Sequence, residues 1–279
     1  MRLCFTSDLH GNPELYNQLG ALLIRERPDL LILGGDLLPD GELDNPDATQ
    51  GGYVRERFLP LVRSWRSSVP EMQVATIMGN HDWSCSQRAI VDAHERGEIV
   101  YLSHERPWRC NGIHFLGYSR TPPSPYWVKD FERLDRASDA TPETGGVVWD
   151  HATQGIREVQ PVEHFRGNPT IADDLLHVTP PPSPWVFVCH GPPFGSKLDQ
   201  LPHIAEPLGS HAIREFVQRS RPLCSLHGHF HESPDVTGSF MMRIGETHCI
   251  NPGQHRNELA AVLFDLPEIV GTIRHTLRA

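Results

Sequence analysis

Five short polar motifs, each following an apolar run, carry the residue types that bind metal ions. They are Asp8-Leu9-His10, Gly35-Asp36, Gly79-Asn80-His81-Asp82, His190-Gly191-Pro192-Pro193 and Gly228-His229-Phe230-His231. In Asp-x-His and His-x-His, side chains two residues apart in extended backbone point the same way and can face one ion. Mixed carboxylate, imidazole and amide ligands suit Mn, Fe, Zn or Ni ions, whereas Ca²⁺ and Mg²⁺ prefer oxygen alone. The motifs therefore predict a transition-metal centre.

Each motif alone has an ordinary structural explanation. A single Asp-x-His is more often a polar pair at a strand end, Gly-Asp is a common turn, and a single His-x-His lies more often on the surface. The motifs occur together, and the 279 residues include 17 histidines, the commonest metal ligand. The combination favours a functional site over a set of unrelated turns.

The periodicity of apolar residues predicts an α/β sheet that would position these motifs. Residues 2–6 predict a buried strand, and Pro13 opens a helix with leucines at helical spacing. Further helices are expected near 53–67, 86–96 and 210–219, and further strands at 30–33, 74–78, 99–102, 185–189, 223–226, 241–244, 259–266 and 269–275. The motifs then stand where strands run out into loops, which is where open α/β sheets bind ligands.

The stretch from Ser119 to Pro184 differs from the rest of the chain. It is rich in proline and has little apolar periodicity. We expect an inserted, loop-rich cap at about 119–184, called the inserted segment below. Because one site drawing on residues 8 to 231 cannot be divided between independent units, we expect a single domain over 1–279.

The overall composition excludes several classes of protein. The net charge of −10 disfavours extended nucleic acid as a partner, since binding its backbone needs clustered Lys and Arg. No stretch approaches the roughly 20 apolar residues of a membrane span. The first residues lack the pattern of an export signal, and six scattered cysteines without CxxC spacing favour free thiols. We therefore expect a cytoplasmic protein without a membrane partner.

In their order and spacing, the five motifs resemble the signature of the calcineurin-like metallophosphoesterase superfamily. Asn251-Pro252-Gly253 is similar to a motif of its small bacterial members, and the segments 190–195 and 228–232 look most like those of the 239AB-type phosphodiesterases. The resemblance implies a four-layer α/β/β/α sandwich of two mixed sheets with flanking helices.

The resemblance also implies a role for each motif residue. It assigns Asp8, His10 and His231 to one metal ion, Asn80, His190 and His229 to a second, and Asp36 to both. A hydroxide bridging two such ions would attack the phosphorus in line. His81 would stabilise the phosphoryl charge or protonate the leaving oxygen, and Asp82 would orient His81.

Residues near the motifs are candidates for substrate contact. Tyr118, Trp127 and Lys129, with Tyr126 beside them, could stack on a nucleobase or bind a phosphate, or could pack the inserted segment onto the body of the protein. Asn12 could reach a phosphate oxygen at a helix start, or could be the N-cap of that helix.

The function that these features predict is hydrolysis of a phosphodiester, either a nucleotide or another small diester. A phosphomonoesterase is the alternative, although a monoester dianion usually needs an added Arg or Lys and none of the motifs contains one. Segment 35–41 lacks the arginine typical of protein Ser/Thr phosphatases. A non-catalytic scaffold is disfavoured because such relatives usually lose ligands, and a double-strand-break nuclease is disfavoured by the acidic charge.

Overall fold

Two mixed six-stranded sheets form the centre of the computed structural model, which describes residues 1–40 and 45–278. Sheet A has the strand order β14 (Arg274–His275), β13 (Val262–Asp265), β1 (Arg2–Thr6), β2 (Leu30–Leu33), β3 (Gln73–Thr76) and β4 (Val100–Tyr101). Sheet B has the order β11 (Met241–Ile244), β12 (Thr247–Ile250), β10 (Cys224–Leu226), β9 (Trp185–Cys189), β6 (Ile113–Tyr118) and β5 (Trp108–Cys110).

Each strand that precedes a motif has at least one parallel neighbour. In sheet A, β1, β2, β3 and β4 pair in parallel, and in sheet B the parallel set is β6, β9, β10 and β12. Strands of this kind are covered on both faces and read as continuous apolar runs. The four residues of Leu30–Leu33 are accordingly all buried.

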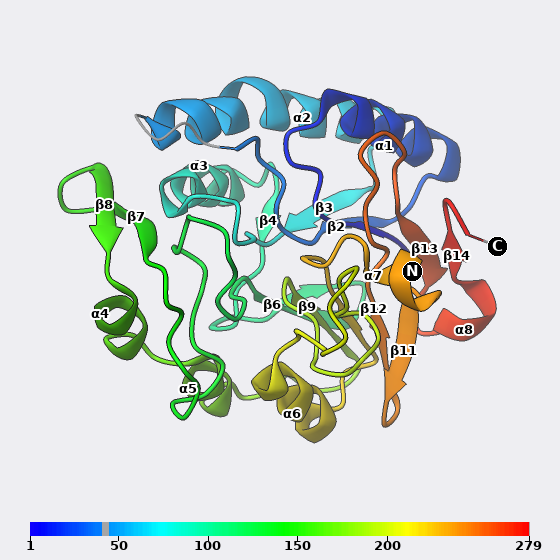
Figure 1. Ribbon diagram of the computed structural model, residues 1–279. Coiled ribbons are helices and arrows are strands. Elements are labelled where there is room, and N and C mark those ends of the chain that lie inside the picture. Colours follow the sequence, from blue (N-terminus) through cyan, green and yellow to red (C-terminus); the bar gives the residue numbers. More distant parts are fainter. Residues whose placement is uncertain (41–44, 279) are drawn as a thin grey trace.

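Helices cover the outer face of each sheet, as Figure 1 shows above and below the strands. On sheet A lie α1 (Pro13–Glu26), two π-helical turns η1 (Asp47–Gly51) and η2 (Val54–Phe58), α2 (Leu59–Ser68) and α3 (Ser84–Glu95). On sheet B lie α5 (Ile171–Leu176) and α6 (His211–Ser220). A separate apolar layer between the sheets includes Phe5, Ile32 and Val188. The order helix, sheet, sheet, helix confirms the predicted four-layer fold.

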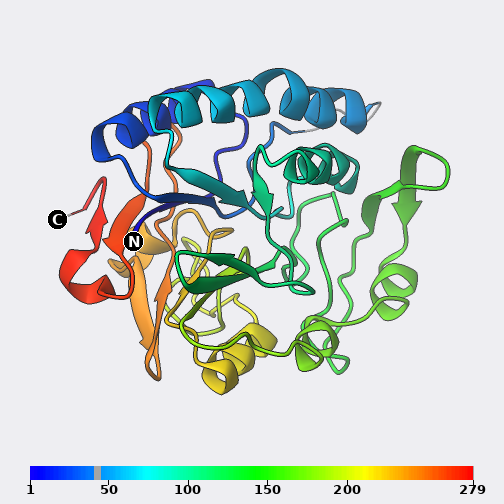
Figure 2. The same cartoon turned by 180° about the vertical axis from the view of Figure 1, so that it is seen from behind.

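The inserted segment forms its own small elements beside the sheets. It contains the hairpin of β7 (Gly146–Asp150) and β8 (Gly155–Val159), followed by α4 (Pro161–Arg166) and then α5. The hairpin extends beyond α3 in both views (Figures 1 and 2). Trp149 of the hairpin and Val128 pack against Trp83, which directly precedes α3. The sequence predicted a loop-rich segment without assigning it regular elements, whereas it carries two strands and two helices.

The predicted strand at 269–275 is wrong. The chain forms the short helix α8 (Ile269–Thr272) before the two-residue strand β14. Thr272 explains the difference, because its hydroxyl donates to the Glu268 carbonyl at 2.5 Å and accepts from the Asp265 N–H at 2.8 Å. Such side-chain bonds to the backbone compete with a strand ladder, in spite of the β-branched sequence.

The hairpin of β5 and β6 was not predicted at all. Its turn is Asn111-Gly112, with φ of 47° and 81°. Asn-Gly between two apolar runs is the strongest short-range signal for such a hairpin. The remaining short helix is α7 (Ser233–Thr237). Throughout residues 1–40 and 45–278, no helix has both the length and the apolar composition needed to span a bilayer.

Candidate metal centre

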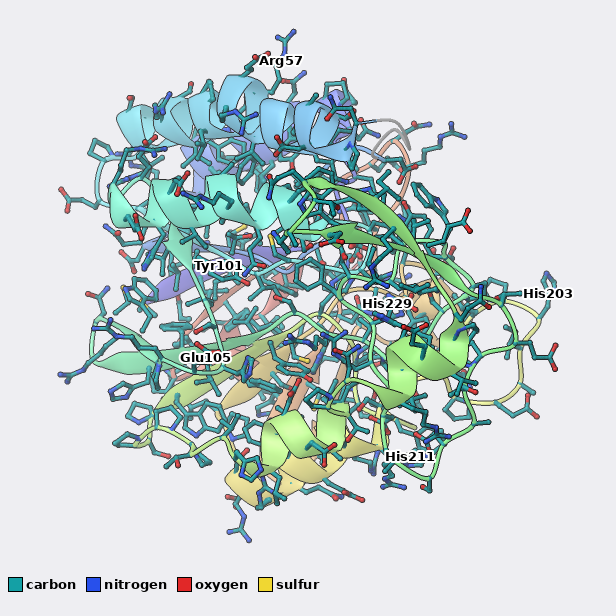
Figure 3. The ribbon with its side chains drawn as sticks, turned by 90° about the vertical axis from the view of Figure 1, so that its left-hand side faces the viewer. Arg57, Tyr101, Glu105, His203, His211 and His229 are labelled. Atoms are coloured by element: carbon teal, nitrogen blue, oxygen red, sulfur yellow. The ribbon has the colours of Figure 1, made fainter. Side chains whose placement is uncertain are left out.

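The predicted motifs all lie on loops that leave the carboxyl ends of parallel strands. Asp8 and His10 follow β1, Asp36 follows β2, Asn80 and His81 follow β3, His190 follows β9, and His229 and His231 follow β10. The carboxyl ends of parallel strands share one edge of their sheet, and the edges of both sheets meet here, where the His229 N–H donates to Asp8 at 3.0 Å. Figure 3 shows His229 well inside the outline of the molecule, with His203 at its margin.

The backbone at these loops has an unusual conformation. Asp8, His10, Asp36 and His229 have φ of 60°, 45°, 52° and 70°, in the left-handed region that non-glycine residues rarely adopt. The Asp8 N–H donates to the Gly35 carbonyl at 3.0 Å, which joins the loops after β1 and β2. Conformations of this kind persist where surrounding contacts impose them, and they concentrate at functional sites.

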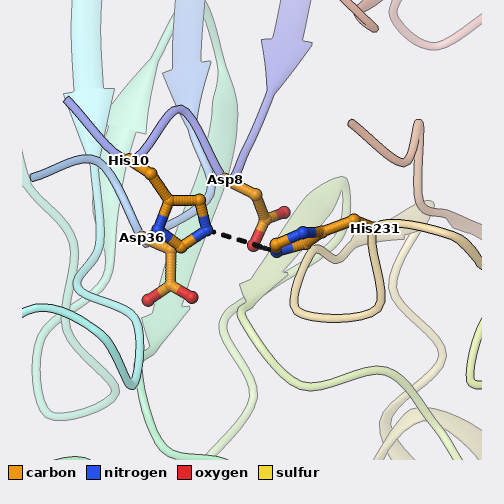
Figure 4. Close-up of side chains that lie close together, drawn as sticks. All are labelled: Asp8, His10, Asp36 and His231. Carbon is orange, nitrogen blue, oxygen red and sulfur yellow. Dashed lines mark hydrogen bonds and ion pairs between the residues drawn. The ribbon is translucent and has the colours of Figure 1, made fainter. Parts of the chain in front are cut away.

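One cluster contains Asp8, His10, Asp36 and His231 (Figure 4). A ligand atom from each lies within 4.8 Å of the ligand atoms of the others. The Nε2 atoms of His10 and His231 are 3.3 Å apart, and His231 Nε2 is 3.3 Å from an Asp8 carboxylate oxygen. Two imidazole nitrogens and a carboxylate therefore converge on one point.

A second cluster contains Asp36, His190 and His229, again within 4.8 Å of one another. Asn80 completes it, because its Oδ1 lies 2.8 Å from His229 Nδ1 and 3.2 Å from His190 Nε2. Asp36 Oδ2 is 3.2 Å from His190 Nε2. Asp36 thus belongs to both clusters, as a carboxylate that bridges two ions must.

The donor set fits transition-metal ions. His190 Nδ1 lies 2.8 Å from the Gly34 carbonyl, so that its proton is held there and the Nε2 lone pair faces Asp36 and Asn80. His190, Asn80 and Asp36 are at most 1% exposed. Lone pairs of nitrogen and oxygen concentrated in a buried space favour the binding of a cation, and this mixture suits Mn, Fe, Zn or Ni.

The electrostatics of the two clusters set the charge of each candidate ligand. Burial opposes the charge of Asp8, but the neighbouring His231 brings the pKa of Asp8 down to about 2. Burial, together with the nearby His190, lowers the pKa of His229 to about 3 and keeps its imidazole neutral. His190 differs, because the Asp36 carboxylate outweighs burial and raises its pKa to about 9. An ion bound there would displace a proton.

Comparison with known proteins gives the family. The model of the calcineurin-like phosphoesterase family matches residues 1–233. The chain belongs to this family. It is therefore a metal-dependent phosphoester hydrolase by family, and the recognition from the five motifs is confirmed.

Solved structures agree on the fold of this metallophosphoesterase. Two of them, one being TT1561 of Thermus thermophilus, have TM-scores of 0.60 and 0.58 at 14% identity, over 98% of this chain and 97% of theirs. An archaeal phosphodiesterase (11% identity, 99% and 98% of the chains) and a dimetal phosphatase from Danio rerio (13%, 94% and 91%) both have TM-scores of 0.45, too low to carry an argument. No curated protein matches the sequence.

His81 stands beside the two clusters of this metallophosphoesterase. Its Nδ1 lies 3.4 Å from an Asp40 carboxylate oxygen, and its ring stacks on Tyr126. Burial favours the neutral ring, but the carboxylates of Asp36 and Asp40 raise the pKa of His81. The contact with Asp40 was not predicted, although Asp40 lies four residues after Asp36 in the same loop.

The prediction that Asp82 orients His81 needs correction. The Asp82 carboxylate instead accepts four backbone N–H groups, from Asp36 at 3.0 Å, Leu37 at 3.2 Å, Leu38 at 3.1 Å and Gly79 at 2.9 Å. Burial and the charge of Asp36 raise the pKa of Asp82 to about 7. Asp82 thus anchors the loop that carries Asp36, and its carboxylate is already engaged by these four N–H groups.

Two residues to which the sequence analysis assigned no role support the same loops. Gln50 is fully buried and donates to the carbonyls of Pro39 and His81, at 2.7 and 3.0 Å. Asn251, of the Asn-Pro-Gly motif, donates to the carbonyls of Gly228 and Phe230, at 3.3 and 3.2 Å. Asn251 thereby holds the turn that presents His229 and His231. Gln50 lies in a helical stretch with no motif to single it out.

Two of the predicted substrate contacts lie in the interior. Lys129 is 2% exposed, and its ammonium is bonded to Glu132 at 2.9 Å and to the carbonyls of Ser124 and Tyr126. Tyr118 is 1% exposed. The Tyr118 hydroxyl donates to Asp174 at 2.9 Å. Side chains that are buried and paired in this way are not free for substrate, so the structure argues against both predictions.

The other two predicted contacts have structural roles. Asn12 Oδ1 accepts the N–H groups of Glu14 and Leu15, at 3.0 and 3.4 Å, and is the N-cap of α1. Trp127 is half-buried, with its ring 5.4 Å from that of Trp83 and 5.6 Å from that of Tyr126. These positions agree with the alternatives stated above, which were helix capping for Asn12 and packing of the inserted segment for Trp127.

Proposed function

We propose that this metallophosphoesterase is a dinuclear-metal-dependent phosphodiesterase, acting on a nucleotide or another small diester. The observation that carries the diester preference is the buried ion pair of Lys129 with Glu132. A monoester dianion has one more negative charge than a diester and usually needs an additional Arg or Lys. Lys129 is one of three basic side chains near the motifs in sequence, with Arg120 and Lys197, and its charge is already neutralised.

In this proposal the chain's own residues serve either as metal ligands or as a proton donor. Asp8, His10 and His231 would hold one ion, Asn80, His190 and His229 the other, and Asp36 both. Two such ions, when bound, lower the pKa of a water molecule and polarise the phosphoryl oxygens. His81 would deliver a proton to the leaving oxygen from Nε2, because Nδ1 faces Asp40.

A substrate panel on metal-reconstituted protein tests the proposal. We expect a higher kcat/KM for bis(p-nitrophenyl) phosphate than for p-nitrophenyl phosphate at matched pH and metal. Since this ratio measures differential binding of the transition states, a monoester advantage of tenfold, about 1.4 kcal/mol, would favour the phosphomonoesterase instead. The variant Asp36→Ala, treated identically, controls for contaminating phosphatases.

The presence of a complete ligand set supports an enzyme over a non-catalytic scaffold. If fully metal-loaded protein hydrolysed no phosphoester in the panel, the non-catalytic scaffold would be favoured instead. We also propose that the substrate is a small molecule in the cytoplasm, and that extended nucleic acid is not a partner. The free state of all six cysteines and the net charge of −10 support these two points.

A further inference from the structure

We propose that Tyr126 is a positioning residue for His81, supplied to the centre by the inserted segment. This inference rests on the proposed function, in which His81 protonates the leaving oxygen. The two rings are stacked, with centroids 3.6 Å apart and an interplanar angle of 13°. The Tyr126 hydroxyl also lies 3.3 Å from Asp40 Oδ1, the oxygen that His81 Nδ1 approaches to 3.4 Å. Tyr126 thus contacts both His81 and its acceptor.

The contacts of His81 restrain its ring. Tyr126 covers one face, and the His10 ring stands against His81 at 74° with centroids 4.8 Å apart. The His81 backbone N–H donates to Asp36 at 2.8 Å. In the part of the chain that the structure describes, Nε2 is the ring nitrogen without a protein partner. Because the terminal torsion of histidine has broad minima, a ring without the stack would sample several orientations.

The loop that carries Tyr126 is fixed from inside. Lys129 and Glu132, 2% and 0% exposed, form an ion pair beneath it. The Lys129 ammonium donates to the carbonyls of Tyr126 and Ser124, and the Ser124 hydroxyl donates to Glu132 at 2.5 Å. A buried network with every member satisfied is rigid. Tyr126 is therefore held against His81 by the loop itself.

A second contact joins this loop to the helix that follows His81. The Asp130 carboxylate accepts the Ser84 N–H at 2.8 Å and the Trp149 N–H at 2.9 Å. Ser84 begins α3, three residues after His81. Tyr126 and His81 are thus tied to the same helix start, so their separation is fixed on both sides of the stack.

The consequence for the reaction depends on the leaving group. An alkoxide needs a proton from His81 as the ester bond breaks, whereas p-nitrophenolate is stable without one. A ring that is held in place delivers the proton more often than one that rotates. Loss of the stack should therefore slow the hydrolysis of alkyl esters and leave that of aryl esters nearly unchanged. A merely structural role would lower both together.

The test measures kcat and KM of Tyr126→Ala on two substrates, a cyclic nucleoside monophosphate and bis(p-nitrophenyl) phosphate. We expect kcat to fall about tenfold on the cyclic nucleotide and by less than about threefold on the aryl diester, with little change in KM. Tyr126→Phe keeps the stacked ring and should retain activity within about threefold of the original on both substrates. Tyr126→Leu fills the space without a planar ring and should behave like the alanine variant.

Three comparisons make the result decisive. Tyr101→Ala removes a half-buried tyrosine on β4, outside the centre, and should change neither rate. Equal losses on both substrates with Tyr126→Ala and Tyr126→Leu, or no loss with either, would overturn the positioning role. His81→Ala separates the two proposals: if it too shows no dependence on the leaving group, the proton-donor function itself is wrong. Metal content and thermal unfolding of every variant show that each is folded and loaded.

Discussion

Replacing Asp82 by alanine removes the acceptor of four buried backbone N–H groups, those of Asp36, Leu37, Leu38 and Gly79. An unsatisfied buried donor costs about 1–3 kcal/mol. The lower end of that range applies here, because the substitution also removes a carboxylate that burial disfavours. The expected loss is about 4 kcal/mol in the free energy of unfolding, out of roughly 5–15 kcal/mol for a whole domain.

Asp82→Asn is the matched control. Asp82 Oδ1 serves Leu37 and Leu38, and Oδ2 serves Asp36 and Gly79, so an amide keeps one acceptor and turns a donor toward the other two groups. About half the loss should follow, roughly 2 kcal/mol.

Urea unfolding of the metal-free variants provides the measurement, with the midpoint and slope fitted together. Because the Asp36 loop is released, Asp82→Ala should also bind metal more weakly. If Asp82→Ala unfolds like the original protein and loses only kcat, as expected for His81→Ala, then Asp82 orients His81 after all and the reasoning fails.

Three further predictions concern the metal ions, the residue roles and the buried ion pair. The purified protein should contain close to two transition-metal ions per chain by elemental analysis and lose hydrolysis with a strong chelator, and activity that survives complete chelation would contradict the two clusters. His81→Ala should lower kcat by about 10²–10⁴-fold and keep its metal content, whereas Asp36→Ala should lose metal as well as activity. Normal activity in both variants would show that these two roles are wrong. Lys129→Met should cost about 3–5 kcal/mol in urea unfolding because Glu132 remains buried without its partner, and adding Glu132→Gln should recover part of that loss.

The convergence of the candidate metal ligands could be predicted because it follows from strand direction. Asp8 and His229 are far apart in sequence, but each follows a buried strand that has a parallel neighbour, and the carboxyl ends of parallel strands share one edge of their sheet. The apolar runs therefore predicted both the sheets and the place where the polar residues meet. The separate assignment of ligands to two ions needed the family pattern, since spacing alone does not tell which loops face each other.

The surroundings of the candidate substrate contacts could not be predicted in the same way. Lys129 has a partner three residues along the chain, but the turn that brings Glu132 beneath it has no periodic signal. Tyr126 meets His81 only because two loops, after β3 and after β6, fold toward each other. Such contacts depend on the path of irregular backbone, which composition and periodicity do not determine. Asp40 illustrates the limit, because its position near Asp36 was visible but its pairing with His81 was not.

The first strand of this protein, β1, pairs with β13, the last strand but one. β1 lies between β2 and β13, and the N-terminal residue Met1 exchanges backbone hydrogen bonds with Leu266. Both termini accordingly lie on one side of the molecule in Figures 1 and 2. The family match ends at residue 233, before β13 begins.

A chain shortened to the matched region would keep every proposed metal ligand and yet leave the β13 side of β1 bare. The residues of Leu3–Thr6 are buried in the whole protein, so that edge would be apolar and ready to pair with the same strand of another molecule. The same exposure exists during synthesis, until the residues of β13 have left the ribosome. Self-association of the shortened chain, rather than loss of ligands, would then decide whether a minimal form of this enzyme can be made.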